Sequence, residues 1–397
     1  MADGYTLNLK GKNAEEFVYT LAKNSFFEDW CYKNPKFPDG KELCDLLIVY
    51  GEIAIIWQIK DLKLDKEGRY DKTEVETNLR QVSGAKRRLF ELKSSIELEN
   101  PRRGREMFDP NQIKEIYLIS ALLGDGEDFF SSVEIKDTNV IHTFTREFTE
   151  LVLNELDTIW DFTNYMKLKE GLVKHNDTML INGGEKELLA CYLTDGRNFD
   201  RLKKYDLLIL DEGMWDEYQK SPEYSAKKKE DQKSYVWDNL INQAHTCGGQ
   251  YELVARELAQ HNRFFRRILS KYFFEAHSIA NKEVVKKQVR RIIPVDGITY
   301  CFLFMDDPEP RAKRKAVLGT ICFVARGVYK TNKKVIGIAT EMKITSVCSY
   351  DFCFLELPEW SEENQKVLEN VQKETGILVS PRIKHVHEDE YPPNSDA

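Results

Sequence analysis

Two strongly β-forming segments, residues 43–50 and 53–60, flank the dipeptide Gly51-Glu52. A two-residue connection that begins with glycine favours a type II′ turn, because its first position needs a positive φ angle. When Tyr50 is paired with Ile53, both faces of the resulting hairpin are largely apolar. Such a hairpin belongs in the buried middle of a covered sheet. The segment therefore predicts an α/β protein whose sheet is covered on both faces.

The same register places three polar side chains on one face, at one end of the hairpin. Asp45 falls directly opposite Gln58, and Lys60 lies two residues further along the second strand. Opposed side chains on one face of a hairpin are close enough to interact. Charges at the edge of an apolar face are costly unless they are paired or bind a metal. The group is therefore either a structural ion pair of Asp45 with Lys60, beside an edge-exposed Gln58, or a chemical site.

A fourth group comes from the helix predicted over residues 13–24. Asn13 is a good N-cap, and Glu16 then occupies the position that closes a capping box. Glu15 instead flanks the apolar stripe of this helix beside Val18, so it can face the sheet. We therefore expect Glu15 to be the functional acid and Glu16 to have a local structural role.

Together these residues resemble the motif of the PD-(D/E)xK nuclease superfamily, in the QxK variant of its Mrr-like restriction endonuclease branch. The residues that carry the resemblance are Gly11, Glu15, Asp45, Gln58 and Lys60. It covers residues 10–150 and implies a restriction-endonuclease-like core, a mixed sheet flanked by helices. Cys44 occupies the position of the proline in the PD-(D/E)xK motif. Gln58 occupies the position at which the motif more commonly has an acidic residue.

The resemblance implies that Asp45, Gln58 and the carbonyl of Ile59 bind Mg²⁺, which Mn²⁺ can replace. Glu15 would help to bind the ion, directly or through water, and its charge is more important because Gln58 is uncharged. Lys60 would orient or activate the attacking water, so the implied catalytic residues are Glu15, Asp45, Gln58 and Lys60. An oxygen-ligated hard cation neutralises charge that builds up on a phosphodiester during hydrolysis.

The implied function is metal-dependent hydrolysis of DNA phosphodiester bonds, in bacterial restriction or anti-phage defence. The alternative is a catalytically silent protein of this fold that acts as a nucleic-acid-binding or scaffold module. A nuclease acting on RNA or on single strands also stays open, because a metal site of this kind contacts only the phosphate. The net charge of −8 argues against a protein that coats nucleic acid through bulk charge.

The N-terminal region is predicted to form a nuclease-like domain over residues 1–176. The run Asn182-Gly183-Gly184 indicates a break, which places the domain boundary near residues 176–184. The elements expected to complete this domain are helices over residues 73–95 and 147–172 and strands over residues 115–122 and 140–144.

Residues 177–380 are predicted to form a smaller α/β or α+β domain, and residues 381–397 a flexible tail. We expect this second domain to regulate the site, to recognise a target, or to bind a protein partner or another copy of the chain. The elements expected in it are helices over residues 236–275 and 312–329 and strands over residues 297–305, 335–339 and 351–357.

Composition predicts a cytoplasmic protein without a membrane partner. No apolar run approaches the roughly 20 residues of a membrane helix, and the first residues lack the character of a signal peptide. The eight cysteines form no CxxC pair, and several lie in apolar, strand-like runs. Buried free thiols in a reducing compartment are therefore expected.

Overall fold

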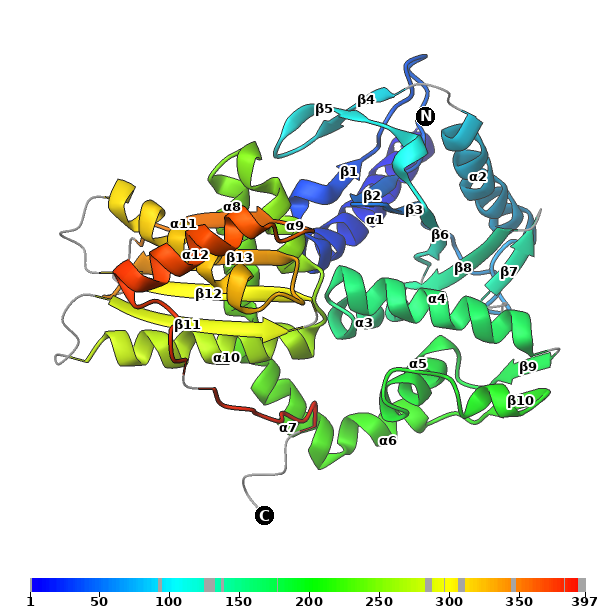
Figure 1. Cartoon of the computed structure of the whole chain (residues 1–397). Helices are drawn as coiled ribbons and strands as arrows, with labels where there is room; N and C mark the ends of the chain where they lie inside the picture. Colours follow the sequence, from blue (N-terminus) through cyan, green and yellow to red (C-terminus); the bar gives the residue numbers. More distant parts are fainter. Residues whose placement is uncertain are drawn as a thin grey trace. The chain divides into compact units, whose positions relative to one another are not determined.

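The computed structural model describes residues 2–91, 95–124, 133–136, 139–176, 178–282, 288–295, 297–305, 311–343, 348–381 and 383–391 (Figure 1). The chain divides into two compact units, Met1–Ser225 and Ala226–Ala397. The boundary expected near residues 176–184 lies inside the first unit. Both units combine helices with mixed or antiparallel strands. Among the described residues, no helix has the length and apolar character needed to cross a bilayer.

The first unit is built on a six-stranded mixed sheet with the order β1-β2-β3-β6-β8-β7. Strands β3, β6 and β8 are parallel, whereas β1, β2 and β7 each run antiparallel to a neighbour. Two strands expected from the sequence are confirmed as β6 and β8. The strands are β1 (Cys31–Lys33), β2 (Leu46–Tyr50), β3 (Ile53–Lys60), β6 (Glu115–Leu122), β7 (Val133–Lys136) and β8 (Asn139–Thr145).

The β2–β3 hairpin has the predicted register. Tyr50 pairs with Ile53, and the ladder continues to Leu46 and Trp57. Gly51 has a φ angle of 56°, whereas Glu52 is not among the residues with positive φ, as a type II′ turn requires. Asp45 and Gln58 therefore face each other one step beyond the last main-chain pair of the hairpin.

Helices cover both faces of this hairpin. Helix α2 (Lys72–Glu91) packs through its apolar stripe onto Ala54 and Ile56. On the opposite face, Trp57 contacts the rings of Phe144 and Phe162. The helices on that face are α1 (Ala2–Phe26), α3 (Arg146–Glu155) and α4 (Ile159–His175). The expected double-sided burial is confirmed, since Ile55 and Ile56 are both fully buried.

Two details of the helices differ from the sequence analysis. Helix α1 begins at Ala2, so Asn13 lies inside the helix and cannot cap it. The helix expected over residues 147–172 is interrupted, because Thr158 caps a new helix by accepting a hydrogen bond from the N–H of Asp161. The remaining elements of this region are β4 (Ile96–Asn100), β5 (Gly104–Phe108), β9 (Thr178–Ile181), α5 (Glu185–Thr194), β10 (Leu207–Leu210), α6 (Met214–Lys220) and α7 (Pro222–Asp231).

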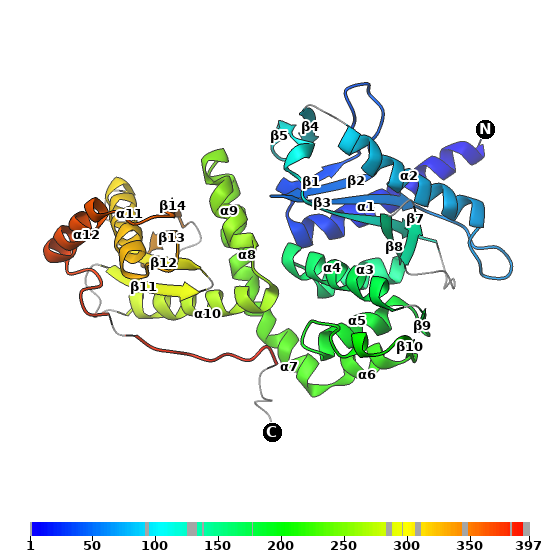
Figure 2. The same cartoon turned by 45° about the vertical axis from the view of Figure 1, so that its right-hand side comes forward.

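The second unit is a four-stranded sheet with the order β11-β12-β13-β14, and α11 joins the parallel pair β12 and β13 (Figure 2). The expected strands and the helix over 312–329 are confirmed, while β11 and α12 are additional. The elements are α8 (Tyr235–Thr246), α9 (Glu252–Ala259), α10 (Arg263–Ala280), β11 (Gln288–Val295), β12 (Ile298–Met305), α11 (Arg311–Val328), β13 (Lys334–Glu341), β14 (Asp351–Glu356) and α12 (Glu362–Thr375).

Part of the predicted tail makes specific contacts within the second unit. Residues 383–391 contain no helix or strand. The guanidinium of Arg267 nevertheless donates hydrogen bonds to the carbonyls of Asp389 and Glu390, and Lys271 pairs with Glu388. These contacts hold the segment against α10.

Candidate active site

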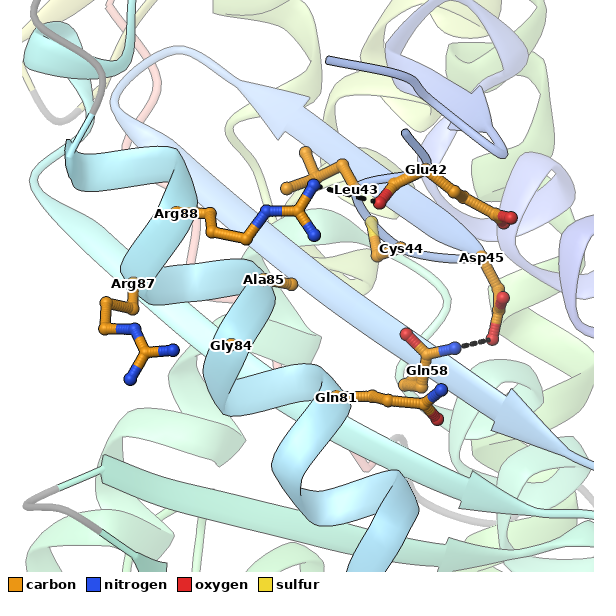
Figure 3. Close-up of a pocket in the computed structure, with 10 residues that line it drawn as sticks. All are labelled: Glu42, Leu43, Cys44, Asp45, Gln58, Gln81, Gly84, Ala85, Arg87 and Arg88. Atoms are coloured by element: carbon orange, nitrogen blue, oxygen red, sulfur yellow. Dashed lines mark hydrogen bonds between the residues drawn. The ribbon is translucent and has the colours of Figure 1, made fainter. Parts of the chain in front are cut away.

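Asp45 is the centre of the polar group at the end of the hairpin. Its side chain is only 8% exposed. The Nε2 of Gln58 donates a 2.7 Å hydrogen bond to Oδ2 of Asp45, and the main-chain N–H of Ile59 donates to the same oxygen (Figure 3). The structure thus brings three of the predicted residues into direct contact.

The contact with Ile59 also places its carbonyl. In an antiparallel ladder, the N–H and the C=O of one strand residue point toward the same neighbouring strand. Because the N–H of Ile59 donates to Asp45, its carbonyl lies on the Asp45 side of β3 as well. The carbonyl oxygen of Ile59 and the carboxylate of Asp45 therefore lie on the same side of β3 at this end of the sheet.

Lys60 has a different partner from the one expected of a structural ion pair. Its ammonium forms an ion pair with Glu74, in the first turn of α2, rather than with Asp45. The side chains of Lys60 and Glu74 are 29% and 49% exposed. An ion pair this exposed contributes at most about 1 kcal/mol, so Lys60 can leave it at little cost. Glu74 was not predicted, because only the packing of α2 over β3 brings it to Lys60.

Asn78 fixes α2 over this end of the sheet. Its fully buried side-chain amide donates hydrogen bonds of 3.3 Å to the carbonyl of Gln58 and 2.8 Å to Oγ of Ser120. Gln58 and Ser120 are paired neighbours on β3 and β6. One asparagine thus ties the helix to two strands directly beside the site.

Glu15 reaches the site from α1. Its carboxylate accepts a 3.0 Å hydrogen bond from Nδ2 of Asn34, whose own N–H donates to the carbonyl of Asp45. Asn34 therefore links the helix to the residue at the centre of the site. Glu16 forms an ion pair with Lys33 instead of the predicted capping box. The structure thus turns Glu15, and not Glu16, toward Asp45.

Glu42 is a further acidic residue that the sequence analysis missed. It lies in the loop between β1 and β2, and its side chain is within hydrogen-bonding reach of Asp45. Arg88 of α2 holds this loop, because its Nη2 donates to the carbonyl of Glu42 and its guanidinium lies 4.1 Å from the ring centroid of Phe37. No periodic pattern marks a loop residue of this kind, so no sequence signal identified it.

The electrostatics of the site are dominated by these carboxyl groups. Burial, together with the charges of Glu15 and Glu42, raises the pKa of Asp45 to about 7, although the hydrogen bond from Ile59 opposes the shift. Burial and the charge of Glu15 also raise the pKa of Glu42. Negative charges that lie close together are stabilised by a shared proton or by a bound cation.

The donors present suit a hard divalent cation. Mg²⁺ is commonly held by one or two carboxylates and keeps several of its waters. In the parts of the chain that the structure describes, no three His, Cys, Asp or Glu side chains gather tightly enough to hold an ion alone. A cation here would instead be held by Asp45 with Glu15 or Glu42, by the carbonyl of Ile59 and by water. Gln58 could join only after its amide turns, since Nε2 now faces Asp45.

A pocket of about 370 Å³ opens between this group and α2 (Figure 3). Carboxylates lie at one side of it and arginines of α2 at the other. Its lining residues are Glu42, Leu43, Cys44, Asp45, Gln58, Gln81, Gly84, Ala85, Arg87 and Arg88. Neither a family model nor a curated protein nor a solved structure matches this chain.

Proposed function

We propose that this protein is a Mg²⁺-dependent nuclease that hydrolyses DNA phosphodiester bonds. The observation that carries the proposal is the buried Asp45, which is fixed by Gln58 and Ile59 and crowded by the charges of two other acids. Such a group is stabilised when a cation binds, and the pocket beside it leaves room for a substrate.

The topology around the site supports the same proposal. A helix, three antiparallel strands and a second helix follow one another as α1, β1, β2, β3 and α2, and after the separate β4–β5 hairpin comes β6, a strand parallel to β3. This order agrees with a restriction-endonuclease-like core over the region of the sequence resemblance. We therefore include that fold assignment in the proposal.

Each residue would have a distinct task. Asp45 and the carbonyl of Ile59 would bind the cation, with Glu15 acting directly or through water. Gln58 orients Asp45 through its hydrogen bond and would become a ligand after its amide turns. Lys60 would leave Glu74 and hold the attacking water. A bound Mg²⁺ would supply charge neutralisation for the phosphodiester.

A catalytically silent nucleic-acid-binding or scaffold protein is the second candidate. It is favoured by one observation, that Gln58 and Lys60 are both engaged within the protein, by Asp45 and Glu74 respectively. A silent protein would bind nucleic acid without cutting it. The biological setting that we propose for the active protein is bacterial restriction or anti-phage defence.

The deciding experiment incubates the purified protein with plasmid, linear duplex, single-stranded DNA and RNA, each in Mg²⁺, Mn²⁺ or EDTA. We expect cleavage with either metal and none in EDTA, and the four substrates separate DNA from RNA activity. The Asp45→Asn variant is the matched control and should be inactive. Cleavage that persists in EDTA or in Asp45→Asn contradicts the proposal, whereas binding without cleavage supports the silent protein.

A further inference from the structure

We propose that the pocket beside Asp45 receives a single unpaired nucleotide, so that the strand to be cut is single-stranded or locally opened. This inference rests on the proposed nuclease function, to which it adds the form of the substrate. The size and position of the pocket are not explained by the metal site alone.

The volume of the pocket selects the class of ligand. Its 370 Å³ lies near the lower end of the range for small-molecule sites, roughly 300–1,000 Å³. A space of this size matches one nucleotide and is too small to enclose a base pair with both of its backbones. Asp45 and Gln58 form part of its wall, so a nucleotide within it would lie beside the proposed cation.

The charges that line the pocket suit a polyanionic chain. Glu42 and Asp45 lie on the side of the proposed cation, and Arg87 and Arg88 lie on the helix side. The described contacts of Arg88 are a 3.4 Å hydrogen bond to the carbonyl of Glu42 and the ring of Phe37, and a guanidinium carries five donors. Arg87 is 74% exposed, and its nearest ion-pair contact, to Glu91, is 3.9 Å long. Both arginines can therefore donate hydrogen bonds to a neighbouring phosphate.

Gly84 keeps the pocket open on the helix side. A glycine inside a helix costs about 1 kcal/mol relative to alanine, so its presence calls for a reason. A Cβ built on Gly84 would meet nothing within 4 Å, and the residue lines the pocket. A larger side chain at position 84 would therefore occupy part of the pocket.

Gln81 supplies a polar contact for a base. It lies one turn before Gly84 and two turns before Arg88, so all three share one stripe of α2. Figure 3 shows its side chain extending toward Gln58. A primary amide both donates and accepts hydrogen bonds, which suits the edge of an unpaired base. Along this stripe, the amide of Gln81, the open space at Gly84 and the guanidinium of Arg88 follow one another.

A substitution at Gly84 tests the inference, because it fills the pocket and leaves the acidic residues of the site unchanged. Gly84→Leu is compared with Gly171→Leu, which changes another glycine inside a helix, in α4, where an added Cβ also meets nothing within 4 Å. Fluorescence anisotropy measures the Kd of labelled oligo(dT), oligo(U) and the corresponding DNA duplex in Ca²⁺. We expect wild-type protein to bind a single strand at least fivefold more tightly than the duplex. Gly84→Leu should weaken single-strand binding at least tenfold, and Gly171→Leu should leave it unchanged.

A second variant keeps the inference testable if Gly84→Leu does not fold. Arg87→Gln should weaken single-strand binding and lower the slope of log Kd against log salt by about 0.7, the value for one phosphate contact. Arg105→Gln is its control, since Arg105 is 71% exposed and is also ion-paired. Wild-type affinity in both Gly84→Leu and Arg87→Gln, or tighter binding of the duplex by wild-type protein, overturns the inference.

A small substrate separates this inference from the proposed function. Bis(p-nitrophenyl) phosphate is a phosphodiester without a base, so it does not need the pocket. If both proposals hold, Gly84→Leu loses a larger share of its rate on a single strand than on this ester, while Asp45→Asn loses both activities. If wild-type protein hydrolyses neither this ester nor nucleic acid, the nuclease proposal fails. The binding measurements then still decide whether the pocket receives an unpaired nucleotide.

Discussion

The Nε2 atom of Gln58 lies 2.7 Å from Oδ2 of Asp45, one residue beyond the last main-chain pair of the β2–β3 hairpin. The amide therefore serves as a donor to the carboxylate and turns its oxygen away from it. A glutamate at position 58 would lack this donor and would bring a further negative charge to Asp45.

We expect Gln58→Glu to destabilise the metal-free protein and to bind Mn²⁺ more tightly. The loss of a hydrogen bond to a charged group costs about 1.5–3 kcal/mol. A second carboxylate, in contrast, adds a strong ligand for a divalent ion. Thermal melting in EDTA and in Mn²⁺ measures both effects. A variant that melts lower than wild type in both conditions contradicts the proposed position of the metal.

Asp45→Asn and Lys60→Ala should each reduce cleavage at least about 100-fold, because a metal ligand and a water-orienting cation act on the transition state. Both variants should melt within a few degrees of wild type, since the ion pair of Lys60 with Glu74 is exposed and the amide oxygen of an asparagine still accepts hydrogen bonds from Gln58 and Ile59. Asp61→Asn is the control, because Asp61 is exposed next to Lys60. Normal cleavage by both variants would refute the assignment.

Glu15→Gln and Glu16→Gln form a matched pair in one helix. The first removes a charge that acts on Asp45 and Glu42, so we expect it to lower the cleavage rate strongly and to weaken Mg²⁺ binding. The second removes only the ion pair with Lys33, worth at most about 1 kcal/mol at a surface site. Rates measured over a range of Mg²⁺ concentrations test this. A dispensable Glu15 with an essential Glu16 would show that the acid was assigned to the wrong position.

The metal-free protein should lose stability as the pH rises from 5 to 8. The pKa of Asp45 is about 7 when folded, against 3.8 for the free group. Between these values the folded protein keeps a proton that the unfolded chain releases, so rising pH favours unfolding. The melting temperature of wild type relative to Asp45→Asn should fall over this range. Mg²⁺ should reduce the fall, and a difference independent of pH would contradict the raised pKa.

A fragment ending at Ser225 should keep the fold of the first unit and bind metal. All the proposed catalytic residues lie within Met1–Ser225. We expect the second unit to control where or when the site acts, through a partner, a target or another copy of the chain. Circular dichroism, gel filtration and cleavage assays compare the fragment with the full chain. An unchanged rate, substrate choice and oligomeric state would mean that the second unit has a separate task.

The hairpin and its polar end could be predicted because they depend on local rules. Alternating side chains and the glycine at position 51 determine the register, and the register places Asp45 opposite Gln58. The short strand β1 (Cys31–Lys33) was missed, since three residues carry too little periodicity. Asn13 was misread as a cap, because a good capping residue can also lie inside a longer helix.

The partners of the site residues could not be predicted in the same way. Glu42 and Glu74 reach Asp45 and Lys60 only because a loop and α2 pack against the hairpin. Contacts between distant segments leave no periodic trace in one sequence. The division of the chain after Ser225 could not be predicted either. The Asn182-Gly183-Gly184 run, which indicates a break in the sequence, forms a connection within the first unit.

The hydrogen bonds of Asn78 to Gln58 and Ser120 have a consequence for how this protein can diverge. A buried amide that bridges a helix to two strands fits only one helix position, so a change at position 120 would remove an acceptor inside the protein. Substitutions at positions 78 and 120 should therefore occur together among related sequences. Such paired replacement would let the helix above the site be rebuilt while the ends of both strands keep their places.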